Sequence, residues 1–319
     1  MKTKAKLFLG KLLIVFSVFL IMLGVAFTFS KDEKLLHPIY DVTLLTSSEN
    51  ETISITTAAS DEEIFPADTS TKVEHDTNPS DNAQSMIKPT ADEVSVLLRE
   101  QIEKTYGVKV KYASETNGYS VGGMSTTPII DPVISQNALI NLNMALALYP
   151  KGFFQEIKSK GYPLTFYLVK RYSTDNVTGV TDSSNKNVII SVATDYDFID
   201  TFHHEVYHYI ERYMLKSGAT FTSWNGLNPA GFKYGVIDSA YSYSSDFSQD
   251  AFFVNSYAMT DQYEDRASTF EYMMKTNKAS CLNYGKTIWL KAKTMSEQID
   301  YFFNTVTPTV TEHWERHLY

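Results

Sequence analysis

The longest uninterrupted hydrophobic stretch of the chain lies near its N-terminus, over Leu12–Phe29. It follows a short segment that contains four lysines and no acid, a pattern typical of an export signal whose positive end stays inside the cell. The run is longer than the roughly 7–15 apolar residues of a signal peptide, and a membrane-spanning helix needs about 17 or more. We therefore expect residues 1–30 to be an uncleaved single-pass membrane anchor with the C-terminal domain outside. Cleavage of this segment would instead give a secreted protein.

Residues 31–88 show a different pattern, without a lasting helical period and with few large apolar side chains. This segment is rich in Ser and Thr, and its acidic residues outnumber its lysines by eight. Such a composition buries too little apolar surface to offset the entropy of ordering the chain. We expect a disordered acidic stalk here and a folded domain over residues 89–319.

Within residues 89–319 the hydrophobic positions alternate between helical and strand spacing. Thr90 and Glu93 form a capping-box pattern before the first helix. Further helices are expected over residues 131–149, 152–162 and 195–215, and strands over 107–113, 163–172 and 185–193, with a turn at 181–187 between the last two strands. This order predicts an α+β fold: a small mixed sheet, a long helix directly after a strand, and a mainly helical C-terminal half.

Charge and cysteine content exclude several classes of protein. The formal net charge of the 319-residue chain is −9, and no basic patch is present, so nucleic acid is not expected as a partner. Cys281 is the only cysteine, which excludes an internal disulfide and a metal site built from paired thiolates.

The helix expected over residues 195–215 contains the pattern H-E-x-x-H, from His204 to His208. Residues four apart lie one turn above each other on a helix, so both imidazoles could bind one metal ion, with Glu205 beside it as a general base. The same five residues can also occur by chance in an ordinary helix. The preceding His203 points about 100° away from His204, so we expect it to pack rather than to bind metal.

A catalytic zinc site requires a third protein ligand. No H-E-x-x-H-x-x-G-x-x-H extension follows His208, and we expect His313 and His317 to lie on an exposed terminal segment. Glu264 is the better candidate, in the first turn of a helix that Thr260 can cap. Its neighbour Asp265 could then orient a ligand. Alternatively, the two acids could form a solvated helix face near a positive helix end.

Four stretches resemble the lethal-factor-like branch of the gluzincin zinc metallopeptidases, which includes the Pro-Pro endopeptidases. They are especially similar to a set of proposed zinc-binding metallopeptidases of Gram-positive bacteria. These stretches are YPKGFFQEI (Tyr149–Ile157), FHHEVYHYIE (Phe202–Glu211), WNGLNPAGFKY (Trp224–Tyr234) and SYAMTDQYEDRASTFEYM (Ser256–Met273).

The resemblance implies a zincin-like fold, Glu264 as the third ligand, and Tyr257 as the group that stabilises the oxyanion. Many gluzincins carry an acid four residues after the third ligand, but this chain has Ser268 there, which makes Asp265 the expected substitute. The resemblance implies a metalloendopeptidase with one Zn²⁺ per chain, Glu205 as general base, and a protein or peptide as substrate. The export signal adds the expectation that this enzyme is extracytoplasmic. A binding protein that lost catalysis, or a zinc hydrolase of a non-peptide bond, remains an alternative.

Overall fold

The computed structural model describes residues 90–182, 184, 186–192, 198–243, 250–275, 281–307 and 309–318. Ala91–Tyr319 forms one compact unit. Its helices are α2 (Ala91–Tyr106), α3 (Pro132–Leu146), α4 (Phe153–Ser159), α5 (Phe198–Lys216), α6 (Gln262–Met274) and α7 (Lys286–Phe302). The strands are β1 (Lys109–Lys111), β2 (Ser120–Val121), β3 (Met124–Thr127), β4 (Thr165–Val169), β5 (Arg171–Tyr172), β6 (Gly179–Asp182) and β7 (Asn187–Ser191). The short 3₁₀ helices are η1 (Ala113–Thr116), η2 (Trp224–Leu227), η3 (Ser239–Tyr241), η4 (Tyr257–Met259), η5 (Cys281–Tyr284) and η6 (His313–His317). The predicted α+β fold class is confirmed.

The main sheet has the strand order β1-β4-β7-β6. β1, β4 and β7 run parallel, and β6 runs antiparallel to β7 at the edge. β7 is buried along its whole length, and β4 along all but its first residue. Nearly continuous apolar runs are typical of parallel strands covered on both faces.

The turn expected between the last two predicted strands needs a correction. The turn after residue 182 joins β6 to β7, whereas β4 and β7 are parallel neighbours. β6 was not predicted, because its four residues, Gly-Val-Thr-Asp, show no alternation of apolar and polar positions. A second, small sheet has the order β2-β3-β5.

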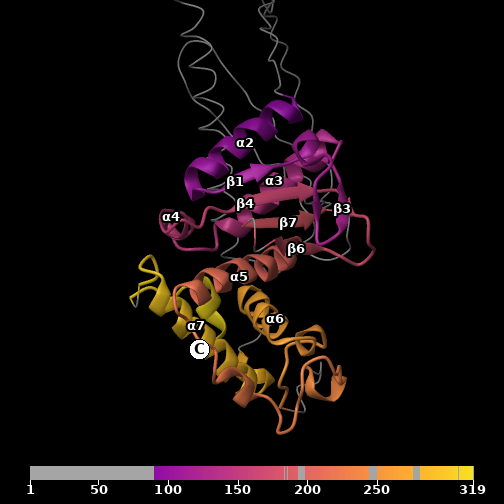
Figure 1. Ribbon diagram of the computed structural model, residues 1–319. Helices are drawn as coiled ribbons and strands as arrows, with labels where there is room; N and C mark the ends of the chain where they lie inside the picture. The colour runs from indigo at the N-terminus through magenta and orange to yellow at the C-terminus, as the bar shows by residue number, and fades with distance from the viewer. Residues whose placement is uncertain are drawn as a thin grey trace, which may run out of the picture. The chain divides into compact units, whose positions relative to one another are not determined.

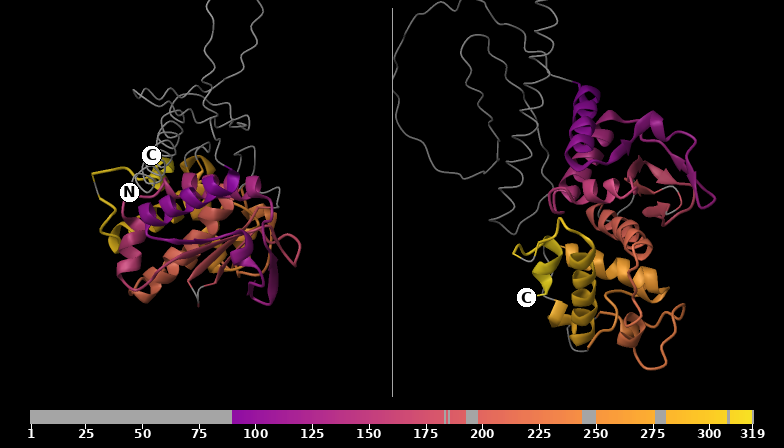
Figure 2. Two further views of the ribbon diagram at one scale, coloured as in Figure 1. Left: turned by 90° about the horizontal axis from the view of Figure 1, so that it is seen from above. Right: turned by 60° about the vertical axis from the view of Figure 1, so that its left-hand side comes forward.

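Helix α5 carries the H-E-x-x-H pattern and lies at the centre of the unit. It contacts β6 and β7 on one side and α6 on the other, so that the sheet and the C-terminal helices flank it (Figure 1). The right-hand view of Figure 2 shows the same order, with α5 between the strand-bearing half and the C-terminal helices. Because α5 is covered from both sides, most of its residues from Thr201 to Met214 are buried.

Helix α6 begins one residue later than predicted. Asp261, rather than Thr260, is the N-cap: its Oδ1 accepts hydrogen bonds from the backbone N–H groups of Tyr263 (2.7 Å) and Glu264 (3.0 Å). The Thr260 hydroxyl instead donates to the carbonyl oxygen of Tyr257 at 2.7 Å. The cap fixes the first turn of α6 and with it the backbone of Glu264.

The prediction that His313 and His317 are exposed is wrong. Both are buried in η6, which packs against α6. Nε2 of His313 lies 3.0 Å from the carbonyl oxygen of Met274, and Nε2 of His317 contacts the carbonyl oxygen of Lys275. These carbonyls belong to the last residue of α6 and the residue after it, where helical hydrogen bonds end. The two imidazoles therefore contact the backbone at the end of α6.

The expected membrane anchor falls within residues 1–89, outside the residues that the structure describes. Among the residues it does describe, no helix is both long and apolar enough to cross a bilayer, since even the 19-residue α5 carries five charged side chains. The prediction of a single-pass membrane protein with the membrane as a partner is contradicted by this finding and is not retained.

Candidate active site

His204, His208 and Glu264 come together where α5 meets the first turn of α6. Their ligand atoms lie within 4.8 Å of one another, and no other such group of metal-ligating side chains was found among the described residues. Oε2 of Glu264 lies 2.9 Å from Nε2 of His204 and 3.4 Å from Nε2 of His208. Ligands at zinc-bonding distance in a tetrahedral site are about 3.3 Å apart. The two-histidine, one-carboxylate set and its spacing therefore fit a zinc ion.

The other ring nitrogen of His204 faces a carboxylate that the sequence analysis missed. Nδ1 of His204 lies 3.2 Å from Oε2 of Glu271, and the other oxygen of Glu271 lies 3.0 Å from Nζ of Lys275. Lys275 in turn pairs with Asp200 at 2.7 Å. A carboxylate on the free nitrogen of a metal-binding histidine fixes the orientation of the ring and raises its basicity. Glu271 thus occupies the place expected for Asp265.

Burial and nearby charges act in opposite directions on the pKa values of His204 and Glu264. Burial alone would lower the pKa of His204, but its hydrogen bonds with Glu264 and Glu271 outweigh burial and raise the pKa to about 10. Burial would likewise raise the pKa of Glu264, yet His204 and His208 hold it well below its usual range. The carboxylates of Glu264 and Glu271 therefore favour a positive charge at His204.

Asp265 points away from these ligands into the core. Its carboxylate accepts hydrogen bonds from Lys291 Nζ (2.8 Å), Trp224 Nε1 (2.7 Å) and the Tyr234 hydroxyl (2.8 Å). Asp265 and Lys291 are both completely buried. These four residues, termed the Asp265 cluster, tie the loop between α5 and α6 to α6 and α7, next to the backbone of Glu264.

A second buried ion pair joins the two site helices directly. Arg266 Nε contacts Oε1 of Glu211, and both side chains are almost fully buried. The guanidinium also lies over the ring of Phe221, 4.6 Å from its centroid. This pair holds α6 against α5 one turn beyond His208. His203, as predicted, packs: it is buried, with Nδ1 3.0 Å from the Tyr149 hydroxyl.

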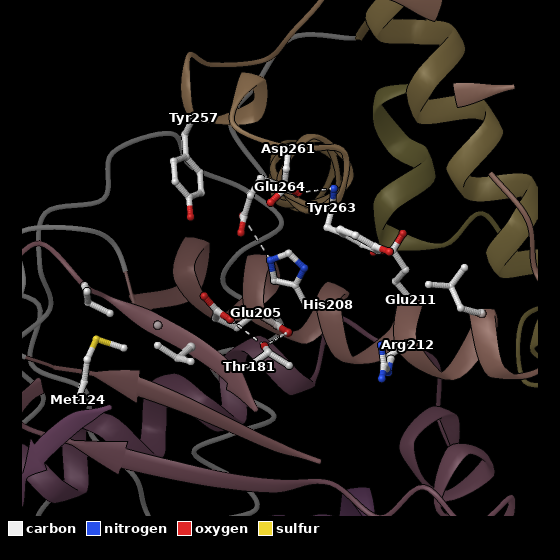
Figure 3. A pocket seen from close by; sticks show the side chains of 14 residues that line it. Met124, Thr181, Glu205, His208, Glu211, Arg212, Tyr257, Asp261, Tyr263 and Glu264 are labelled. Carbon is white, nitrogen blue, oxygen red and sulfur yellow. Dashed lines mark hydrogen bonds and ion pairs between the residues drawn. The ribbon is translucent and has the colours of Figure 1, made fainter. Parts of the chain in front are cut away.

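Glu205 lies on the sheet side of the ligand trio, against β6. The Thr181 hydroxyl lies 2.7 Å from Oε2 of Glu205 and also 2.7 Å from its carbonyl oxygen. Glu205, His208 and Glu264 line a cavity of about 520 Å³ that is closed on one side by β6 and on the other by the start of α6 (Figure 3).

Tyr257 belongs to η4, just before α6, and its phenol points into the same cavity (Figure 3). The side chain is half exposed, and its ring centroid is 5.9 Å from that of His204. Burial, followed by the charges of Glu264 and Glu205, raises the pKa of Tyr257. The hydroxyl therefore keeps its proton at neutral pH and can donate a hydrogen bond.

Comparisons with known proteins give one distant likeness. No family model matches the chain, and no curated protein matches it. The fold is similar to a crystal structure of a proposed zinc-binding metallo-peptidase from Bacteroides caccae ATCC 43185, with 13% sequence identity and a TM-score of 0.47. The match covers 73% of this chain and 92% of that one. A similarity this remote carries no argument about function, which rests on the site itself.

Proposed function

We propose that this protein is a zinc metalloendopeptidase of the gluzincin type, with His204, His208 and Glu264 as the zinc ligands. The convergence of two imidazole nitrogens and one carboxylate oxygen at the wall of a cavity is the observation that carries the proposal. Three protein ligands leave a fourth position open, as in catalytic zinc sites.

The side chains around this trio match the needs of peptide hydrolysis. Bound zinc would polarise the scissile carbonyl and lower the pKa of a water molecule. Glu205, which is not one of the three ligands, accepts a proton from the attacking water and delivers it to the leaving amine. Tyr257 donates a hydrogen bond to the carbonyl oxygen as negative charge develops there.

The sheet offers a place for an extended substrate. β6 ends the strand order of its sheet and pairs only with β7 among the described strands. Its residues Gly179, Val180 and Thr181 line the cavity next to Glu205. A peptide that pairs with the outer edge of β6 would place its main chain across the cavity, and peptide recognition by an open sheet edge is a common mode.

Glu205→Gln tests the proposal because it keeps the size of the side chain and removes the base. The wild-type protein, loaded with zinc, should cleave members of a mixed peptide library, as measured by mass spectrometry. Glu205→Gln should bind zinc to the same level and lose activity by about 10²–10⁴, the range for a general base. An intact library in the presence of the zinc-loaded wild type, or wild-type cleavage by Glu205→Gln, would refute the proposal.

A further inference from the structure

Strand β6 faces helix α5 with Gly179 and Thr181, which are two residues apart and so lie on the same face of the strand. Both meet Glu205. The Thr181 hydroxyl is within hydrogen-bond distance of the Glu205 carboxylate, at 2.7 Å from Oε2. A Cβ atom added to Gly179 would lie 2.5 Å from Cγ and 2.9 Å from Oε1 of Glu205. The edge strand therefore contacts both the stem and the head of this side chain.

The two contacts act on different parts of Glu205. A glutamate side chain has three rotatable bonds, and its terminal torsion is broad. Thr181 holds Oε2, while the missing side chain at Gly179 leaves room for Cγ and Oε1. Oε1 is thus the carboxylate oxygen that Thr181 leaves free to take a proton.

Thr181 is itself rigidly placed. Its backbone pairs with Val188 in the antiparallel ladder between β6 and β7, and a β-branched side chain has few rotamers. Its hydroxyl is also 2.7 Å from the carbonyl oxygen of Glu205, so one hydrogen is shared between the backbone and the carboxylate of the same residue. Through this double contact, one residue of β6 holds both the backbone and the carboxylate of Glu205.

We propose that Thr181 is the positioning residue of the general base: its hydroxyl holds Oε2 of Glu205 so that Oε1 faces the reacting water, and Gly179 provides the space for that conformation. The inference rests on the proposed function, because it assigns a role to Glu205 in proton transfer. It adds a task for the edge strand besides the binding of an extended peptide. A displacement of about 1 Å in a reacting group can lower a rate on the order of 100-fold.

The matched variants are Thr181→Val, which keeps the shape and removes the hydroxyl, and Thr181→Ser, which keeps the hydroxyl. With zinc-loaded protein and a peptide that the wild type cleaves, Thr181→Val should lower kcat about 10- to 100-fold with little change in KM. Thr181→Ser should restore most of the lost rate. Zinc content and melting temperature, measured on the same samples, should stay close to wild type for both. An equal loss in both variants, or a loss that follows melting temperature, would assign Thr181 a structural role only.

Gly179→Ala tests the second contact. The added methyl group must displace the Glu205 stem or Thr201, whose Cγ2 would lie 2.8 Å away. We expect a loss in kcat at least as large as that of Thr181→Val, at unchanged zinc content. An active Gly179→Ala variant would contradict the assigned role of this glycine.

A double-mutant cycle separates action through Glu205 from an independent effect. In a Glu205→Gln background, Thr181→Val should lower the residual rate less than twofold, because the group that it positions is gone. A crystal structure of zinc-loaded Thr181→Val should show the Glu205 carboxylate turned away from its wild-type position. A wild type that cleaves no peptide refutes the proposed function. A cleaving wild type with additive effects in the cycle, or with an unmoved Glu205 in the variant structure, overturns only the role of Thr181.

Discussion

Two neighbouring acids on helix α6 face two different regions of the molecule. Glu264 faces the cavity, where its oxygen meets the ring nitrogens of His204 and His208. Asp265 faces the core and belongs to the Asp265 cluster. Both residues were expected either at the same metal site or on one solvated helix face, yet the structure separates them.

The difference between the two regions lies in their hydrogen-bond donors. In the Asp265 cluster each partner of the carboxylate brings its own hydrogen: an ammonium, an indole N–H and a phenol. In the cavity, Nε2 of His204 is an acceptor when Nδ1 gives its hydrogen to Glu271, and the Glu264 carboxylate oxygen is always an acceptor, so a proton or a cation must lie between them. A buried acid whose partners are all donors stabilises the fold, whereas converging acceptors at a cavity form a binding site.

Lys291→Met tests the Asp265 cluster, and we expect it to have the largest effect, a loss of stability. It leaves the buried carboxylate of Asp265 without its cation, which costs about 3–5 kcal/mol of unfolding free energy. Denaturant unfolding measures the loss. The double variant Lys291→Met/Asp265→Asn is the control, and it should recover part of the stability because no charge then stays unpaired. A single variant as stable as wild type would mean that the cluster does not anchor α6.

Tyr257→Phe tests the role of the Tyr257 hydroxyl in the cavity, and we expect the fold to stay intact. The variant keeps the ring and removes only the hydroxyl that points into the cavity. We expect kcat to fall on the order of 10²–10³, the range for loss of one oxyanion donor, with KM, zinc content and melting temperature unchanged. If Tyr257 is merely one of many packed tyrosines, the melting temperature will fall and kcat will not.

Glu271→Gln tests how His204, one of the proposed zinc ligands, is held in place. Glu271 orients His204 from the far side of the ring, and loss of such a partner typically weakens metal affinity 10- to 100-fold. Competition with a zinc chelator measures the change. Glu297→Gln, which removes an exposed acid that pairs with Lys293, is a suitable control. Equal zinc affinity in the two variants would show that Glu271 has no role in zinc binding.

Local spacing was enough to predict part of the site. His204 and His208 lie four residues apart on a helix, so their common face follows from helix geometry. Glu264 was selected by residue type, by the predicted start of its helix and by the family resemblance, and the structure brings it to the two histidines. Zinc binding by these three residues is a prediction, and measurements of zinc content test it.

The missed residues depend on packing between distant elements. Glu271 reaches His204 only because α5 and α6 lie side by side, and it stands seven residues after Glu264 instead of four. Thr181 lies on a strand with no apolar alternation, so neither β6 nor its contact with Glu205 had a signal in the sequence. The burial of Asp265 depends on Lys291, which follows it by 26 residues.

Zinc content of purified Glu264→Ala, measured by mass spectrometry beside the wild type and Glu205→Gln, tests the central claim most directly. We expect one zinc per chain in the wild type and in Glu205→Gln, because Glu205 is a base and not a ligand. Glu264→Ala should lose the ion while it stays folded, since two histidines alone bind zinc far more weakly than three ligands. A zinc-free wild type, or full occupancy in a folded Glu264→Ala variant, would contradict the assignment of this cavity as a zinc site.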